Sequence, residues 1–364
     1  MIKIKPYTEL PLPNQDEAFR LYLSMAARAL PFYPEDIFPD GYFYPDGFTK
    51  KPIAKFNRKT DLAKVLHAEK IIEQFSTELH SFLYFGAKGN GHVVPENLRT
   101  LLTTAVDDDS LVAAGLGDIL KHSPDADKKV RKELLEYVFR YESFRSQKQI
   151  HHFVNLLGVD VCPYCNRQFI TTLDRKKGAS PIRPELDHYR NKSLYPFLAL
   201  SILNLIPSCP TCNHIKSDGK EPLLYPYKED MGTNVYFRTL PVTGITYLTG
   251  GKVASKDFNL VFQHRPDTDG DLIAHSRQSI NALRLSDLYS SHRDYISDLM
   301  LQRYIFTDDM ITELRERFPI LFHSDEEVRN MLLLTDINQD SWGKRPLTKL
   351  THDISDELDE LYKN

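Results

Sequence analysis

The four cysteines of this 364-residue chain form two Cys-x-x-Cys pairs, Cys162 with Cys165 and Cys209 with Cys212. Each two-residue spacer folds as a tight turn that directs both sulfurs to one side, so two such pairs can offer four thiolates to one tetrahedral zinc. We therefore expect a structural zinc site that ties residue 162 to residue 212. Because every cysteine belongs to this arrangement, metal-held thiolates in a reducing compartment are favoured over disulfides.

The composition is typical of a soluble globular protein, with 41% hydrophobic and 26% charged residues. No apolar run approaches the roughly 20 residues that a membrane span requires. The first residues, Met1 to Pro6, lack the apolar core and the cleavage site of a signal peptide. We expect a cytoplasmic protein that has no membrane partner.

Charge is distributed unevenly along the chain. The whole chain carries −4, yet the segment from Cys162 to Lys220 has nine basic and four acidic residues and so carries +5. The remaining 37 basic and 46 acidic residues leave −9 for the rest. A basic centre suits a site that meets phosphate, whereas the acidic flanks do not favour coating of nucleic acid. Chance clustering is the alternative explanation.

Hydrophobic spacing divides the chain into three expected regions and predicts an α+β protein. Residues 1–158 are mainly helical in pattern, with helices predicted at about 15–29, 60–86, 95–106, 110–120 and 127–157. Residues 159–222 contain the cysteine pairs. Residues 223–364 predict two to four antiparallel strands over 235–262, followed by helices from 271 onward, over 312–321 and over 353–362.

Two further features of the first region have open interpretations. Five aromatic residues lie between Phe38 and Phe48 around a repeated Pro-Asp-Gly turn, and they form either a partner surface or a segment that packs on the helices behind it. His151 and His152 precede the first cysteine pair, and without a third ligand nearby they are predicted to lie at the surface rather than to bind metal.

Between the cysteine pairs the pattern predicts a strand, a loop, a second strand and a helix. Ile182 to His188 is the first expected strand, and it ends on Asp187 and His188. Leu203 to Pro207 is the second and includes Asn204. The helix that opens at Cys209 presents Asn213, His214 and Lys216 from its first turns.

These residue types meet the needs of phosphodiester hydrolysis. His188 can act as the general base that deprotonates water, provided that its imidazole is held in one orientation. Asp187 and Asn213 offer the oxygen ligands that Mg²⁺ or Mn²⁺ prefers. Asn204 is placed to hold the loop beside the histidine. The candidate contacts to nucleic acid are Arg190, Lys192, His214 and Lys216.

The run Asp187-His188, Asn204-Leu205 and Cys209-x-x-Cys212-Asn213-x-x-Lys216 resembles the HNH nuclease motif, or ββα-metal fold. The branch it resembles has a hairpin and helix braced by a four-cysteine zinc. The resemblance covers about 60 of the 364 residues. It implies that His188 is the base, that Asn204 is the middle Asn, and that Asp187 and Asn213 bind the catalytic metal. His214 is the alternative ligand to Asn213.

The phrasing around the motif is similar to Septu-type and retron-associated HNH nucleases of bacterial anti-phage systems. The shared segments are Val159–Asn166, Leu186–Tyr189 and Asn213–Ser217. This similarity implies a DNA endonuclease that leaves 5′-phosphate and 3′-hydroxyl ends and works beside an ABC- or SMC-like ATPase. The alternatives are a restriction- or homing-type HNH nuclease, or a zinc-stabilised nucleic-acid-binding or adaptor subunit that does not cut.

Overall fold

The computed structural model describes residues 1–4, 14–29, 102–103, 136, 139–147, 149–173, 182–216, 223–242 and 253–362. The aromatic segment at 38–48 and the helices predicted at 60–86 and 110–120 lie outside these residues. Of the helix predicted at 95–106, Leu102 and Thr103 are described, and both are helical.

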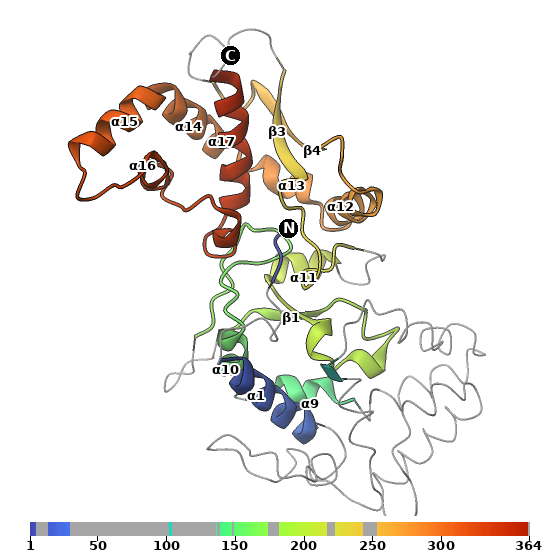
Figure 1. Ribbon diagram of the computed structural model, residues 1–364. Coiled ribbons are helices and arrows are strands. Elements are labelled where there is room, and N and C mark those ends of the chain that lie inside the picture. The colour runs from blue at the N-terminus through green and yellow to red at the C-terminus, as the bar shows by residue number, and fades with distance from the viewer. Residues whose placement is uncertain are drawn as a thin grey trace, which may run out of the picture. The chain divides into compact units, whose positions relative to one another are not determined.

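The described residues form a mixed α and β structure with two small sheets, which is compatible with the expected α+β class (Figure 1). One sheet pairs β1 (Glu185–His188) with β2 (Leu205–Ser208), and the other pairs β3 (Val235–Pro241) with β4 (Phe258–His264). The helices before β3 are α1 (Asn14–Ala29), α9 (Tyr141–Arg145), α10 (Ile150–Leu156) and α11 (Pro210–Lys216). Those after β4 are α12 (Gly270–Ala282), α13 (Leu285–Ser290), α14 (Arg293–Ile305), α15 (Asp308–Arg317), α16 (Asp325–Leu332) and α17 (Thr348–Tyr362).

The chain forms two compact units that alternate along the sequence. The cysteine unit comprises Met1–Ile4, Val159–Thr171 and Ser208–Asn364, and the histidine unit comprises Lys5–Gly158 and Thr172–Pro207. The division at 158 and 222 expected from sequence stays a prediction. Among the described residues, no helix has the length and apolarity needed to cross a membrane.

In the histidine unit, α1 packs against α9 and α10 around Tyr22. The Tyr22 ring lies 5.9 Å from that of Phe144 and 5.7 Å from that of Phe153, measured between ring centres. The carbonyl oxygens of Leu102 and Leu200 both lie within reach of the Tyr22 hydroxyl and share its single O–H donor. A single buried tyrosine therefore joins both helices to the loop that follows β1.

The single helix predicted over 127–157 is wrong for its described part, because α9 ends at Arg145 and α10 begins at Ile150. The break lets Gln147 donate its side-chain amide to the Met25 carbonyl of α1, at 2.6 Å. The surface prediction is also wrong for His151, which is buried at 7% exposure on α10. His152 is exposed as predicted and contacts Glu17 at 2.7 Å.

In the cysteine unit, β3 and β4 form an antiparallel hairpin whose register runs from Val235 opposite His264 to Pro241 opposite Phe258. Helix α17 lies along β3 (Figure 1). Its side chains supply hydrogen-bond acceptors to the edge of that strand. Asp353 accepts the backbone N–H of Phe237 at 2.9 Å, and Glu357 accepts that of Thr239 at 3.0 Å. Because Asp353 and Glu357 are one helical turn apart, they match alternate N–H groups of the strand.

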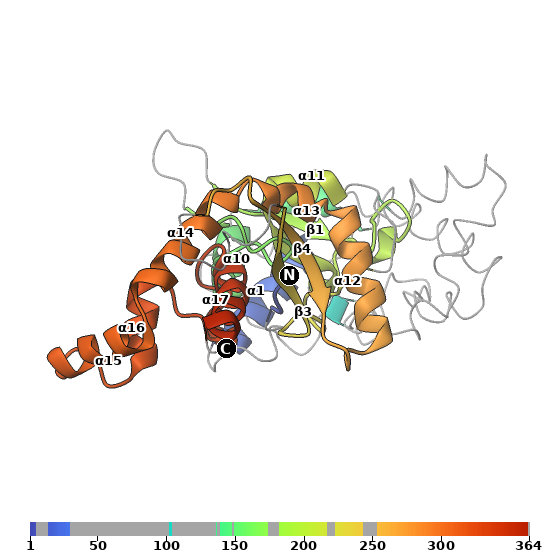
Figure 2. The same ribbon diagram turned by 90° about the horizontal axis from the view of Figure 1, so that it is seen from above.

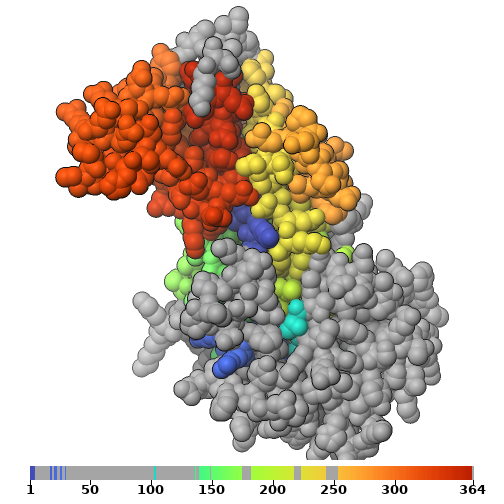
Figure 3. Space-filling view, viewed as in Figure 1, coloured from blue at the N-terminus to red at the C-terminus, as the bar shows by residue number. Residues whose placement is uncertain are grey.

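Helices α14, α15 and α16 project from α17 on the side away from α12 (Figure 2, Figure 3). Side-chain caps begin two of them: Thr307 accepts the N–H of Met310 before α15, and Ser324 accepts that of Glu327 before α16. The helix predicted over 312–321 instead spans Asp308–Arg317. It ends two residues before Pro319, because a proline disfavours helical backbone at the residue that precedes it.

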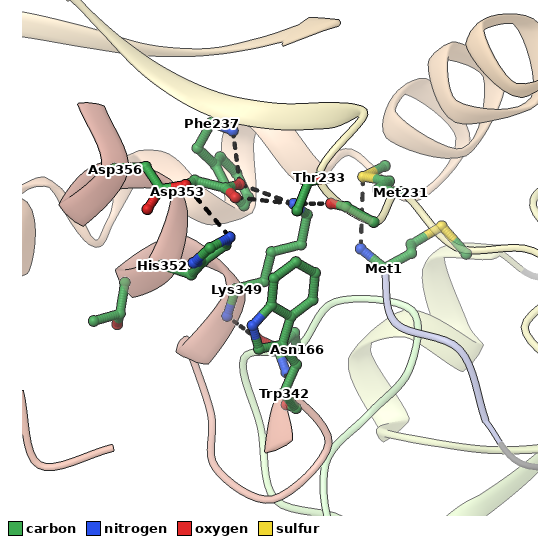
Figure 4. Close-up of polar contacts among 12 residues, drawn as sticks. Met1, Asn166, Met231, Thr233, Phe237, Trp342, Lys349, His352, Asp353 and Asp356 are labelled. Atoms are coloured by element: carbon green, nitrogen blue, oxygen red, sulfur yellow. Dashed lines mark hydrogen bonds and ion pairs between the residues drawn. The ribbon is translucent and has the colours of Figure 1, made fainter. Parts of the chain in front are cut away.

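A buried ion pair anchors the start of α17 (Figure 4). The Lys349 ammonium lies 2.9 Å from the Asp353 carboxylate, and the two side chains are 1% and 2% exposed. Lys349 also donates to the Gly232 carbonyl at 2.7 Å, and it stands 4.8 Å from the centre of the Trp342 ring. Its donors are thus met by a carboxylate, a carbonyl and an aromatic face.

Candidate metal centre and histidine site

All four cysteines are buried in the cysteine unit, with Sγ atoms that lie within 4.8 Å of one another. The Sγ atoms of Cys165 and Cys209 are 4.0 Å apart. A tetrahedral zinc with Zn–S bonds of about 2.3 Å places its sulfurs about 3.8 Å apart. All four are free thiols rather than disulfide partners. The cluster therefore has the dimensions and the donor atoms that bind a metal such as zinc.

Backbone hydrogen bonds shape each pair into a turn. The Cys162 carbonyl oxygen accepts the N–H of Asn166 at 2.8 Å, and the Cys165 sulfur accepts the N–H of Arg167 at 3.4 Å. In the second pair, the Cys209 sulfur accepts the N–H of Cys212 at 3.4 Å. Backbone N–H groups that point at sulfur stabilise the thiolate, which is the form that binds metal.

The thiols perturb one another strongly. Burial raises the pKa of Cys162, whereas hydrogen bonds from the neighbouring thiols, Cys162 first, lower the pKa of Cys209. Four adjacent thiolates cannot remain ionised in a buried site without a compensating cation. A divalent metal resolves this conflict, so the electrostatics of the cluster fit a zinc ion.

Asn166 joins the first cysteine pair to α17. Its backbone has φ = +49°, a left-handed conformation that Asn tolerates better than most residues. Its side chain donates to the Trp342 carbonyl at 2.7 Å and accepts the N–H of Lys349 at 3.1 Å. The Tyr289 hydroxyl donates to the Cys165 carbonyl. These contacts support the cluster from the C-terminal helices.

The predicted base lies in the histidine unit at the end of β1. Asp187 and His188 are 5% and 9% exposed. Nε2 of His188 lies 3.0 Å from the Ala199 carbonyl oxygen. A carbonyl only accepts, so this nitrogen carries a proton, and whenever the ring is neutral Nδ1 is the nitrogen that can accept one. The contact therefore selects the Nε2–H tautomer of the neutral ring.

Asn204 closes the loop between His188 and β2. Its Oδ1 accepts the N–H of Arg190 at 2.7 Å, and its Nδ2 donates to the carbonyls of Arg190 and Leu198 at 3.1 and 2.9 Å. Its own carbonyl accepts the N–H of Tyr189 at 2.9 Å. The side chain is fully buried. Asn204 therefore holds this loop, but it does so from the end of a 3-10 helix, Ile202–Asn204, and not from within the strand expected over 203–207, because β2 begins at Leu205.

The two basic residues of this loop lie against aromatic rings. The guanidinium carbon of Arg190 is 5.7 Å from the centre of the Tyr189 ring and 6.0 Å from that of Tyr195. The Lys192 ammonium is 4.8 Å from the centre of the Tyr141 ring and 3.6 Å from a Glu142 carboxylate oxygen. Both are partly exposed. Their expected contact with nucleic acid stays a prediction.

The remaining predicted residues lie on α11 in the cysteine unit. His214 is exposed, Asn213 is half-buried, and Lys216 is buried at 4% exposure. The structure thus places Asp187, His188 and Asn204 together in one unit, and Asn213, His214 and Lys216 together in the other. The expected metal-binding role of Asp187 with Asn213 or His214 stays a prediction, as does the phosphate contact of Lys216.

Two neighbours of His188, Tyr141 and Ala199, were not expected from sequence. Tyr141 precedes His188 by 47 positions, and Ala199 contributes only a backbone carbonyl, so neither leaves a local signal. No protein-family model, no curated protein and no solved structure matches this chain.

Proposed function

We propose that this protein is a metal-dependent endonuclease of the HNH type that hydrolyses phosphodiester bonds in DNA. The observation that carries the proposal is the hydrogen bond from His188 Nε2 to the Ala199 carbonyl, at 3.0 Å, beside Asp187. In the neutral ring this leaves Nδ1 as the nitrogen that can accept a proton, and a base that activates water needs such a nitrogen. The Asn204 hydrogen bonds support it further, because they hold the loop that supplies this carbonyl.

The donor chemistry of the predicted metal ligands suits a hard cation. Carboxylate and amide oxygens, from Asp187 and Asn213, are ligands that Mg²⁺ and Mn²⁺ accept. Such an ion supplies charge neutralisation at the scissile phosphate. His188 takes the proton of the attacking water at Nδ1, while the Ala199 carbonyl stabilises the imidazolium that results.

The zinc has a structural role in this proposal. Four thiolates complete a tetrahedral site and leave no position open for substrate, which is characteristic of structural rather than catalytic zinc. The same cluster supports the second candidate, a zinc-stabilised nucleic-acid-binding or adaptor subunit that does not cut. The partner that we propose in both cases is an ABC- or SMC-like ATPase in anti-phage defence.

A plasmid-nicking assay separates the two candidates. We expect the protein, with its zinc retained, to nick supercoiled DNA when Mg²⁺ or Mn²⁺ is added and to stop when EDTA is added. A protein that shifts the plasmid on a gel but never nicks it, with either metal and with the ATPase present, would contradict the enzyme and favour the binding subunit.

A further inference from the structure

Tyr141, on α9, packs directly on the imidazole of His188. The two ring centres are 4.4 Å apart and the ring planes are inclined by 70°, which is an edge-type aromatic contact. Tyr141 is 8% exposed and His188 is 9% exposed, so both rings of the contact are largely buried.

The tyrosine is held on the same strand that carries the histidine. Its hydroxyl donates to the Leu186 carbonyl at 3.1 Å, two residues before His188 on β1. Burial raises the pKa of Tyr141 well above its ordinary value, so the hydroxyl remains a neutral donor. Its ring is also faced by the Lys192 ammonium at 4.8 Å. A hydrogen bond at the hydroxyl and a cation–π contact at the ring thus hold the side chain in place.

Two further contacts join α9 to the segment that forms β1. Arg145 pairs with Glu185 at 3.0 Å, and Arg183 donates to the Arg145 carbonyl at 2.7 Å. Together with the Tyr141 hydroxyl, they connect this one short helix to positions 183, 185 and 186. The helix that carries the tyrosine ring is therefore bonded to the strand that carries His188.

The contact restrains His188 in a different way from the hydrogen bond to the Ala199 carbonyl. That hydrogen bond fixes the position of Nε2, whereas a ring packed on the imidazole also restrains its tilt. The Tyr141 ring blocks this motion from the side. Tyr141, Lys192 and Ala199 also line a cavity of about 370 Å³, so removal of the tyrosine ring would enlarge an existing space.

From this geometry we infer that Tyr141 is a positioning residue, which holds the His188 imidazole at one tilt so that Nδ1 faces the attacking water. Helix α9 is then a component of the active site, although the sequence assigns it to the separate helical region 1–158. The inference rests on the proposed function of His188 as general base. The orientation of the imidazole can nevertheless be measured without any cleavage.

The test compares three full-length variants. Tyr141→Leu removes the ring, and Tyr141→Phe keeps the ring but removes the hydroxyl. Tyr227→Leu is the control, because Tyr227 is a buried tyrosine of the cysteine unit at 7% exposure. Isotope-labelled histidine reports the ring protons of all 13 histidines by NMR, and a His188→Gln variant identifies the signal of His188.

We expect the His188 ring protons to carry a ring-current shift in the wild type and in Tyr141→Phe, and to lose it in Tyr141→Leu. In the cleavage assay, Tyr141→Leu should lower kcat by about 10²-fold with little change in KM, since a misplaced catalytic group has about this effect. Tyr141→Phe should retain most of the activity. Tyr227→Leu should leave both the His188 signal and kcat unchanged.

An unmoved His188 signal in Tyr141→Leu would overturn the inference, whatever the cleavage result. A signal that moves as expected, in a protein that cuts no DNA under any condition, would uphold the positioning contact and overturn the proposed nuclease function instead. Equal loss of kcat in Tyr141→Leu and in Tyr227→Leu would assign Tyr141 a general structural role and would also overturn the inference.

Discussion

At the scale of single residues, the Lys349–Asp353 pair shows how strongly burial changes the value of an ion pair. Its side chains are 1% and 2% exposed, whereas those of the surface pair Arg284–Asp287 are 68% and 65% exposed. Removal of one partner from a buried pair leaves an uncompensated charge, at a cost of about 3–5 kcal/mol. Exposed pairs contribute about 0–1 kcal/mol.

We therefore predict that Lys349→Met and Asp353→Asn each lower the free energy of unfolding by several kcal/mol, which urea denaturation measures. The matched changes Arg284→Met and Asp287→Asn should lower it by less than about 1 kcal/mol. Equal effects at the two sites would contradict the burial argument.

At the scale of elements, α17 completes the edge of the β3–β4 hairpin with side chains instead of a third strand. Glu357 accepts both the N–H and the hydroxyl of Thr239, at 3.0 and 2.7 Å. Glu357→Ala should cost about 1–3 kcal/mol, because the buried donors lose their acceptor. The freed strand edge should also promote self-association.

Thermal unfolding and light scattering test this effect, with Glu360→Ala as the control. Glu360 lies on the same helix but is 65% exposed and 3.9 Å from Arg238. Its removal should change neither quantity appreciably. A Glu357→Ala protein as stable and as monomeric as the control would show that the edge needs no covering.

The strands β3 and β4 and the helix α1 were predictable because each has a local signal. Alternating apolar residues predicted β3 and β4, and α1 was predicted over 15–29 and observed at Asn14–Ala29. The break between α9 and α10 was not predictable, since it depends on the contact of Gln147 with α1. The apolar spacing is the same on both sides of such a break, so only tertiary packing reveals it.

The candidate site was predictable to the same extent. The Cys-x-x-Cys spacing predicted a cluster whose sulfurs lie within 4.8 Å, and Asn204 was expected to hold the loop that it does hold. Tyr141 was not predictable, because an aromatic residue in a helical pattern is ordinarily assigned to the core. Its contact with His188 exists only once α9 is packed against β1.

At the scale of the whole molecule, the cysteine cluster joins segments 159–171 and 208–364 of one unit. Cys162→Ser should abolish zinc binding and sharply lower the melting temperature, because a closed four-thiolate site contributes its binding free energy to folding. Elemental analysis should find one zinc per wild-type chain. The control is Val328→Thr, an isosteric polar change at a fully buried residue of the same unit. This variant should retain its zinc. Full stability without zinc would refute the structural role.

Charge across the whole chain predicts that the proposed nuclease activity depends on a partner. Outside residues 162–220 the balance is −9, from 37 basic and 46 acidic residues, whereas affinity for DNA grows with the number of Lys and Arg contacts to phosphate. We expect weak cutting by the isolated chain at about 0.15 M salt, and strong cutting once an ABC- or SMC-like ATPase presents the DNA. Robust plasmid digestion by the isolated chain at that salt concentration would contradict this dependence.

The most direct test of the central claim is a single-turnover cleavage assay of His188→Ala on end-labelled duplex DNA, with Mg²⁺ and the proposed ATPase partner. His323→Ala, a change at an exposed histidine of the cysteine unit, is the control. We predict that His188→Ala keeps its zinc and binds DNA but cuts about 10²- to 10⁴-fold more slowly, the factor expected for a general base. Wild type and control should leave 5′-phosphate ends. Cleavage by His188→Ala at the rate of the control would contradict the assignment of His188 as the base.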